Sequence, residues 1–108
     1  MRNGLYKVTF QTPLGSGAGV VVLNDGRLLG GDSSISYVGS YRQDGHTFSA
    51  LVDTTMHTSV PGMFNVLGTP NAKVSLSGTV SNDHAEMTGN TLNAPSAVLQ
   101  ATLEFLTA

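Results

Sequence analysis

The side chains that could do acid–base or metal chemistry are few and lie far apart along the chain. Three histidines stand at positions 46, 57 and 84, and none has a second histidine or a carboxylate at a metal-ligand spacing such as His-x-His or His-Glu-x-x-His. We interpret His46, His57 and His84 as surface side chains in loops and turns. Asp53 and His57 could approach each other around a strand end. The spacing therefore predicts no metal site and no cofactor.

The serines also lack the setting of a catalytic nucleophile. No Gly-x-Ser-x-Gly turn occurs, and Gly31-Asp32-Ser33-Ser34 lacks the second glycine and the following helical pattern. We expect Asp32 to accept backbone hydrogen bonds at a corner of the chain. The glycine-rich segment 15–19 is not a phosphate-binding loop, because a valine-rich strand follows it where a helix is required. These patterns predict a protein that is not an enzyme.

Composition excludes further classes of protein. The chain has 108 residues, which fits one domain over 1–108, and 40% of them are hydrophobic, too many for a disordered segment. Five Lys and Arg are spread along a chain of net charge −2, so we expect no nucleic-acid binding. The chain has no cysteine and no apolar stretch of membrane-spanning length, and its N-terminus lacks signal-peptide organisation. We expect a cytoplasmic protein that does not bind membranes.

The elements that must position these side chains are strands. Hydrophobic residues alternate with polar ones along most of the chain, and Asp25-Gly26, Asp44-Gly45 and Asn82-Asp83 are typical hairpin turns. This pattern predicts eight strands, over 4–12, 18–23, 27–30, 34–42, 47–54, 73–81, 85–89 and 97–106, with loops at 13–17, 89–90 and 94–96. The second strand is nearly all apolar, so we expect it to be covered on both faces.

Short strands joined by hairpins, with no long helical pattern, predict an all-β fold. We expect a small antiparallel up-and-down β-barrel of about eight strands, since closure removes the exposed edges of a sheet. Residues 56–70 interrupt the strand pattern with prolines and glycines among apolar residues. This segment could plug one end of the barrel, form a dimer contact or cover an apolar cavity.

Several short motifs occur together in this order along the chain. Gly4-Leu5-Tyr6 opens a strand, Asn24-Asp25-Gly26 precedes Gly30-Gly31-Asp32, Tyr37-x-Gly39 follows, and Val80-Ser81-Asn82-Asp83 lies in a later hairpin. Over about residues 3–106 the chain thereby resembles the GrlR family, negative regulators associated with type III secretion in Gram-negative bacteria. The resemblance implies a lipocalin-like barrel that pairs as a homodimer and sequesters a transcriptional activator without binding DNA.

One departure from that family concerns the partner. The family has a run of acidic residues in the hairpin after the Tyr-x-Gly strand, whereas this chain has Gln43, Asp44, Gly45 and His46 there, preceded by Arg42. Only Asp44 keeps the acidic character. We therefore expect a partner to contact this hairpin, but not the same activator in the same way. The partner-binding residues predicted are Arg42, Gln43, Asp44 and His46.

A second function stays open beside protein binding. Eight strands can enclose one small ligand or be filled by side chains. Small residues stand among large ones on the inward faces, at Gly39, Ala50, Gly78 and Ala101, and could leave room for an apolar or lipid-like molecule. The residues predicted to line such a cavity are Tyr37, Tyr41, Phe48, Leu76 and Phe105.

Overall fold

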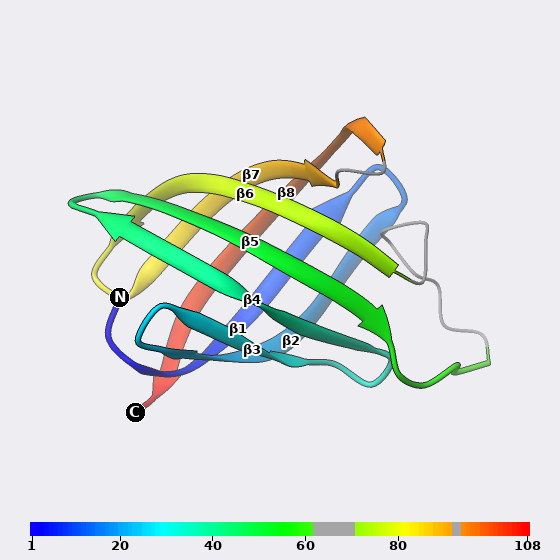
Figure 1. Cartoon of the computed structure of the whole chain (residues 1–108), viewed down its shortest axis with the longest axis horizontal. Helices are drawn as coiled ribbons and strands as arrows, with labels where there is room; N and C mark the ends of the chain where they lie inside the picture. The colour runs from blue at the N-terminus through cyan, green and yellow to red at the C-terminus, as the bar shows by residue number, and fades with distance from the viewer. Residues whose placement is uncertain (62–70, 92–93) are drawn as a thin grey trace.

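In the computed structural model, residues 1–61, 71–91 and 94–108 are described, the side chains of 94–97 excepted, and they form eight antiparallel strands. Each strand pairs with the next, and the last pairs with the first to close a barrel (Figure 1). The predicted all-β, up-and-down barrel is confirmed. The strands are β1 (Gly4–Thr12), β2 (Gly15–Asn24), β3 (Arg27–Gly31), β4 (Ile35–Asp44), β5 (Thr47–Met56), β6 (Asn71–Ser81), β7 (His84–Thr91) and β8 (Ala94–Thr107).

Several strands are longer than predicted. β2 begins at Gly15, because its ladder with β1 continues to the pair Thr12–Gly15. β7 runs to Thr91 and β8 begins at Ala94, so the loops predicted at 89–90 and 94–96 are wrong. Glycine and proline weaken a strand pattern in the sequence, but pairing on both sides keeps these residues in the barrel wall.

The hairpin turns match the prediction except for one. Asp25 and Gly26 have φ of 50° and 87°, and Asn82 and Asp83 have 50° and 63°, as a type I′ turn requires. In the β4–β5 hairpin, however, Asp44 pairs with Thr47, so the turn residues are Gly45 and His46. Only Gly45 has a positive φ there, 60°, which is the pattern of a type II′ turn. The predicted turn was one residue too early.

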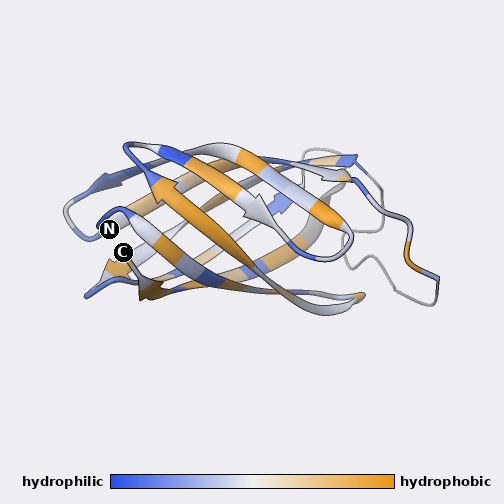
Figure 2. Ribbon diagram, turned by 90° about the horizontal axis from the view of Figure 1, so that it is seen from below, coloured by the Kyte–Doolittle hydropathy of each residue, from blue (hydrophilic) through white to orange (hydrophobic). Residues whose placement is uncertain are grey.

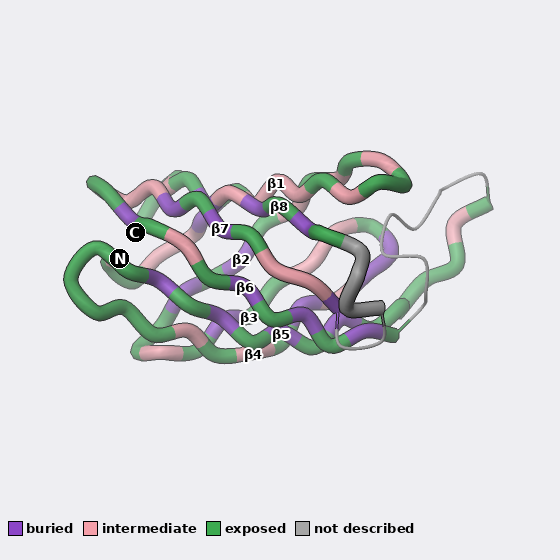
Figure 3. Tube along the Cα trace, turned by 90° about the horizontal axis from the view of Figure 1, so that it is seen from above, coloured by how far each residue is buried: buried purple, intermediate pink, exposed green. Residues whose placement is uncertain are grey.

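The interior of the barrel is filled by the inward side chains of all eight strands. Buried and exposed residues alternate along β5 and most of β6 (Figure 3). Hydrophobic segments lie on the strands, whereas the turns near the termini are hydrophilic (Figure 2). The largest fully buried side chains are those of Tyr6, Phe48, Leu23, Leu103 and Val21.

β2 is not covered on both faces, contrary to the prediction. Val21 is 2% exposed and points inward, whereas Val20 and Val22 are 44% and 42% exposed. The apolar run therefore lies half inside and half outside the barrel, because successive side chains of a strand point to opposite faces. A run of this kind looks the same in sequence whether or not something covers its outer face.

Two inward glycines let neighbouring strands approach closely. A Cβ on Gly78 would lie 1.8 Å from the carbonyl oxygen of Glu86, and one on Gly39 would lie 2.1 Å from that of Leu51. Both distances are far below any real contact. These glycines permit strong coiling of the wall. They were expected to leave room for a ligand, and that expectation is wrong for Gly39 and Gly78, because neighbouring backbone occupies the space.

Replacing Gly78 by alanine should destabilise the fold by more than about 2 kcal/mol, because the added methyl group forces β6 and β7 apart. Ser77→Ala, at the exposed neighbouring position, is the matched control and should change stability by less than about 0.5 kcal/mol. Urea unfolding of the three proteins measures both effects. Equal midpoints for Gly78→Ala and Ser77→Ala would show that the wall tolerates a side chain there.

Candidate functional site

The barrel interior holds a small, partly open apolar cavity of about 60 Å³. The described residues that line it include two of the five predicted, Tyr37 and Leu76, together with Ala50 and Ala101. The polar atoms near it are already bonded, since Thr54 donates from Oγ1 to the Ala72 carbonyl oxygen, 3.2 Å away. The cavity therefore offers apolar contact only.

The other three predicted cavity residues, Tyr41, Phe48 and Phe105, are not among the described residues that line this space. They belong to the hydrophobic core at the end of the barrel that holds both termini (Figure 1). Tyr41 stacks on Phe48 with ring centroids 5.5 Å apart, and Phe105 meets Tyr6 edge-on at 5.3 Å. The guanidinium of Arg2 lies 3.7 Å from the centroid of the Phe105 ring. Aromatic packing and a cation–π contact close this end.

Asp32 organises the corner between β3 and β4. Its Oδ1 accepts the backbone N–H groups of Ser34, at 2.8 Å, and Ile35, at 2.7 Å, which confirms the predicted turn. The Tyr37 hydroxyl donates to Oδ2 of the same carboxylate. Three donors therefore occupy the Asp32 carboxylate, so it is a structural acceptor rather than a free base.

The chain after β5 is tied to this same corner. The backbone N–H of His57 donates to the Ser34 carbonyl oxygen at 2.9 Å, and Ser34 Oγ donates to the Thr58 carbonyl oxygen at 2.9 Å. His57 Nε2 lies 3.0 Å from the Asp32 carbonyl oxygen. A carbonyl can only accept, so this nitrogen holds the proton. His57 therefore meets Asp32, whereas Asp53 pairs with Lys73 at 3.6 Å.

The predicted partner-binding hairpin borders a surface hollow of about 690 Å³. Arg42, Gln43 and Asp44 line this hollow, whereas His46 lies in the turn and is not among its described lining residues. Its floor and far side come from β5 and β6, through Thr47, Phe48, Ser49, Ser77, Gly78 and Thr79. Gln43 is held in place, because its Oε1 accepts from the amino terminus and its Nε2 donates to the Gly45 carbonyl oxygen at 3.0 Å.

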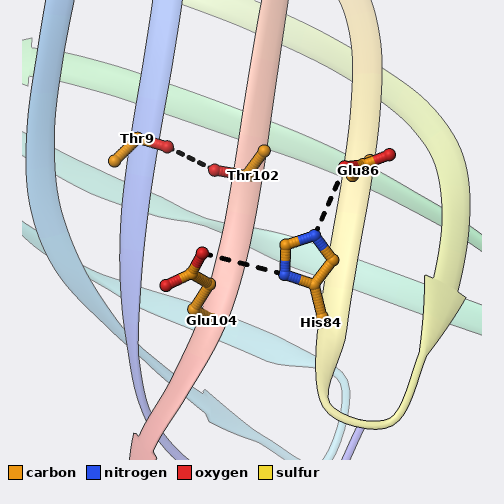
Figure 4. Close-up of polar contacts among 5 residues, drawn as sticks. All are labelled: Thr9, His84, Glu86, Thr102 and Glu104. Atoms are coloured by element: carbon orange, nitrogen blue, oxygen red, sulfur yellow. Dashed lines mark hydrogen bonds and ion pairs between the residues drawn. The ribbon is translucent and has the colours of Figure 1, made fainter.

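A polar cluster on the outer wall escaped the sequence analysis. His84 Nε2 lies 3.5 Å from Glu86 Oε1, and His84 Nδ1 lies 3.9 Å from Glu104 Oε1, while the hydroxyls of Thr9 and Thr102 bond nearby (Figure 4). His84 and Glu104 are partners in the β7–β8 ladder, a pairing that residue spacing alone does not show.

This cluster is not arranged to chelate one ion. The two carboxylates contact opposite nitrogens of the imidazole ring, so His84, Glu86 and Glu104 do not converge on one point. Within residues 1–61, 71–91 and 94–108, no group of three or more His, Asp or Glu side chains could hold a metal ion. The same described part of the chain has no helix long and apolar enough to span a membrane.

Comparison of the chain with protein-family models and with curated proteins finds no match.

Tyr37 should make the protein sensitive to alkali. Burial, and then the hydrogen bond to Asp32 and the charge of that carboxylate, raise the pKa of Tyr37 above its ordinary value of 10.0. A tyrosine in the unfolded chain ionises near pH 10. The stability that Tyr37 contributes is thus complete below pH 10 and is lost as the pH rises further, by up to about 1.4 kcal/mol per pH unit.

Urea unfolding of wild type and Tyr37→Phe between pH 8 and 11 tests this. At pH 8 the variant should be roughly 1–3 kcal/mol less stable, because it lacks a hydrogen bond to a charged group. Above pH 10 its stability should fall less steeply than that of wild type, because phenylalanine cannot ionise. Parallel pH profiles for the two proteins would contradict the assignment.

Proposed function

We propose that this protein is a non-enzymatic regulator, resembling the GrlR-type negative regulators, which acts by binding a protein partner. A transcriptional activator is the class of partner that the resemblance implies. The supporting observation is the hollow beside the β4–β5 hairpin, where Arg42 and Asp44 stand exposed at the border. Complementary charges at such a border guide a partner into register.

The hollow suits a polar segment of a partner protein. This segment would carry one acidic and one basic side chain. Arg42 and Asp44 are two residues apart on β4 and pair in the ladder with Ser49 and Thr47, so both point outward. A partner carboxylate near Arg42 and a partner ammonium or guanidinium near Asp44 would match them. Between these charges the wall offers hydroxyl groups for hydrogen bonds.

Reversing both charges in Arg42→Glu/Asp44→Arg should reduce partner capture roughly tenfold or more, since like charges then face each other. The matched control is Asp53→Lys/Lys73→Glu, which reverses an exposed ion pair on β5 and β6. Each protein is immobilised and exposed to native lysate, and bound proteins are quantified by mass spectrometry. If wild type and the Arg42/Asp44 variant retain the same proteins in equal amounts, the hairpin is not the contact surface.

A second candidate, binding of a small apolar molecule inside the barrel, is favoured by the apolar lining of the 60 Å³ cavity. An apolar cavity of about 150 Å³ can hold benzene, so this one fits a smaller guest unless side chains move. Met87 lines the space and is the most adaptable of its side chains.

Native mass spectrometry of freshly purified protein should then show an added mass that disappears on denaturation. Ala101→Val places two further carbons in the cavity and should reduce the amount of added mass. A spectrum with only the bare chain, in both proteins, would eliminate this candidate and leave protein binding unaffected.

A further inference from the structure

Residues 1–3 are tied to two different turns of the barrel. Arg2 Nε lies 3.0 Å from Asp83 Oδ2 in the β6–β7 turn. Asn3 makes two hydrogen bonds with Asp25 in the β2–β3 turn, since its Nδ2 donates to Asp25 Oδ1 at 3.0 Å and its Oδ1 accepts the Asp25 backbone N–H at 3.0 Å. We call residues 1–3 the strap and the two bonds of Asn3 the Asn3–Asp25 clamp.

The fold requires a glycine immediately after Asn3. Gly4 has a φ of 153°, and a Cβ there would lie 2.6 Å from the Thr107 carbonyl oxygen and 2.8 Å from Cε1 of Phe105. No other asparagine in the sequence is followed by glycine. A glycine has no side chain to keep its backbone nitrogen away from the preceding amide, so Asn-Gly is the pair in which asparagine cyclises most readily.

We propose that Asn3 is a site of spontaneous deamidation, and that this modification opens the Asn3–Asp25 clamp. The backbone nitrogen of Gly4 attacks Cγ of Asn3 and forms a new C–N bond. The side-chain amide nitrogen leaves as ammonia and takes the proton of the Gly4 nitrogen with it. Water then hydrolyses the five-membered succinimide at one of its two carbonyl carbons. Aspartate results from one cleavage, and isoaspartate, in which the backbone runs through the former side chain, from the other.

The clamp controls how fast this reaction occurs. Cyclisation changes the side-chain and backbone torsions of Asn3, whereas both polar atoms of its amide are bonded to Asp25 in the folded protein. Both bonds must therefore break before Asn3 can react. The rate of deamidation then reports the fraction of molecules in which the strap is open.

Deamidation prevents the clamp from closing again. Aspartate at position 3 lacks the amide hydrogen that Asn3 donates, and it places a second carboxylate beside that of Asp25, where like charges repel. Isoaspartate also lengthens the backbone by one carbon atom directly before Gly4, which pairs with Leu23 at the start of β1. The modified protein therefore keeps its strap open.

Peptide mapping of wild type after incubation at mildly alkaline pH tests the site, with mass spectrometric fragmentation to locate each deamidated residue. Asn3 should deamidate faster than Asn82 and Asn90, which precede aspartate and threonine. The folded protein should react at least roughly fivefold more slowly than the same protein in urea, because one net hydrogen bond contributes about that factor.

Arg2→Ala tests the role of the strap, because it removes the ion pair with Asp83 and the contact with the Phe105 ring. It should speed deamidation of Asn3 in the folded protein roughly twofold or more, and leave the rate in urea unchanged. Arg27→Ala is the matched control, since Arg27 is an exposed arginine at the start of β3 beside the same turn, and it should react like wild type.

Asn3→Asp reproduces the aspartate product without the reaction, and Asn3→Ala removes both bonds of the clamp without adding a charge. Both variants should unfold at a lower urea concentration than wild type. Added salt should reduce the loss for Asn3→Asp, because it screens the two carboxylates, and should not reduce the loss for Asn3→Ala.

The proposal is overturned if Asn3 deamidates no faster than Asn82, if folded and urea-unfolded wild type react equally fast, or if Arg2→Ala and Arg27→Ala react at the same rate. It is also overturned if Asn3→Asp is as stable as wild type. The reaction involves none of the residues that line the hollow, so these outcomes do not depend on the proposed partner binding.

Discussion

Pairing between the first and the last strand is the constraint on which the rest of the structure depends. β1 meets β8 from Leu5–Thr107 to Gln11–Gln100, so residues almost a full chain length apart complete the ladder. This pairing satisfies the backbone groups of two strands that would otherwise be open edges. It also decides, for every residue of the wall, whether its side chain points inward or outward.

Closure limits what the interior can do. The barrel wall coils around a narrow space, and this brings neighbouring strands close together at Gly39 and Gly78. The backbone of the next strand occupies the space that a side chain would need at these two glycines. Large aromatic rings close the end near the termini, and the Asp32 corner with His57 organises the other end. The apolar cavity lined by described residues of the wall measures about 60 Å³. The interior is therefore mainly a packed core, with polar groups bonded at its ends.

The local pattern predicts the strands and turns well because both depend on neighbouring residues. The alternation Phe48, Ala50, Val52 and the turn Asn82-Asp83 need no knowledge of the rest of the chain. Features that depend on register could not be predicted in this way. The meeting of His84 with Glu104, the separation of Tyr37 from Phe105 and the exposure of Val20 and Val22 all follow from which strands lie beside each other. Residue type alone does not contain that information.

A closed wall also restricts how such a protein can bind another. In the described residues every strand has a neighbour on both sides, so an extended peptide has no fully open edge strand to join, although β3 pairs only with Val20–Asn24 of β2. Side chains on the outer wall, the turns and the interior are then the main surfaces available for recognition. The outer wall has two unlike surfaces, apolar across β2 to β4 and hydroxyl-rich on β6.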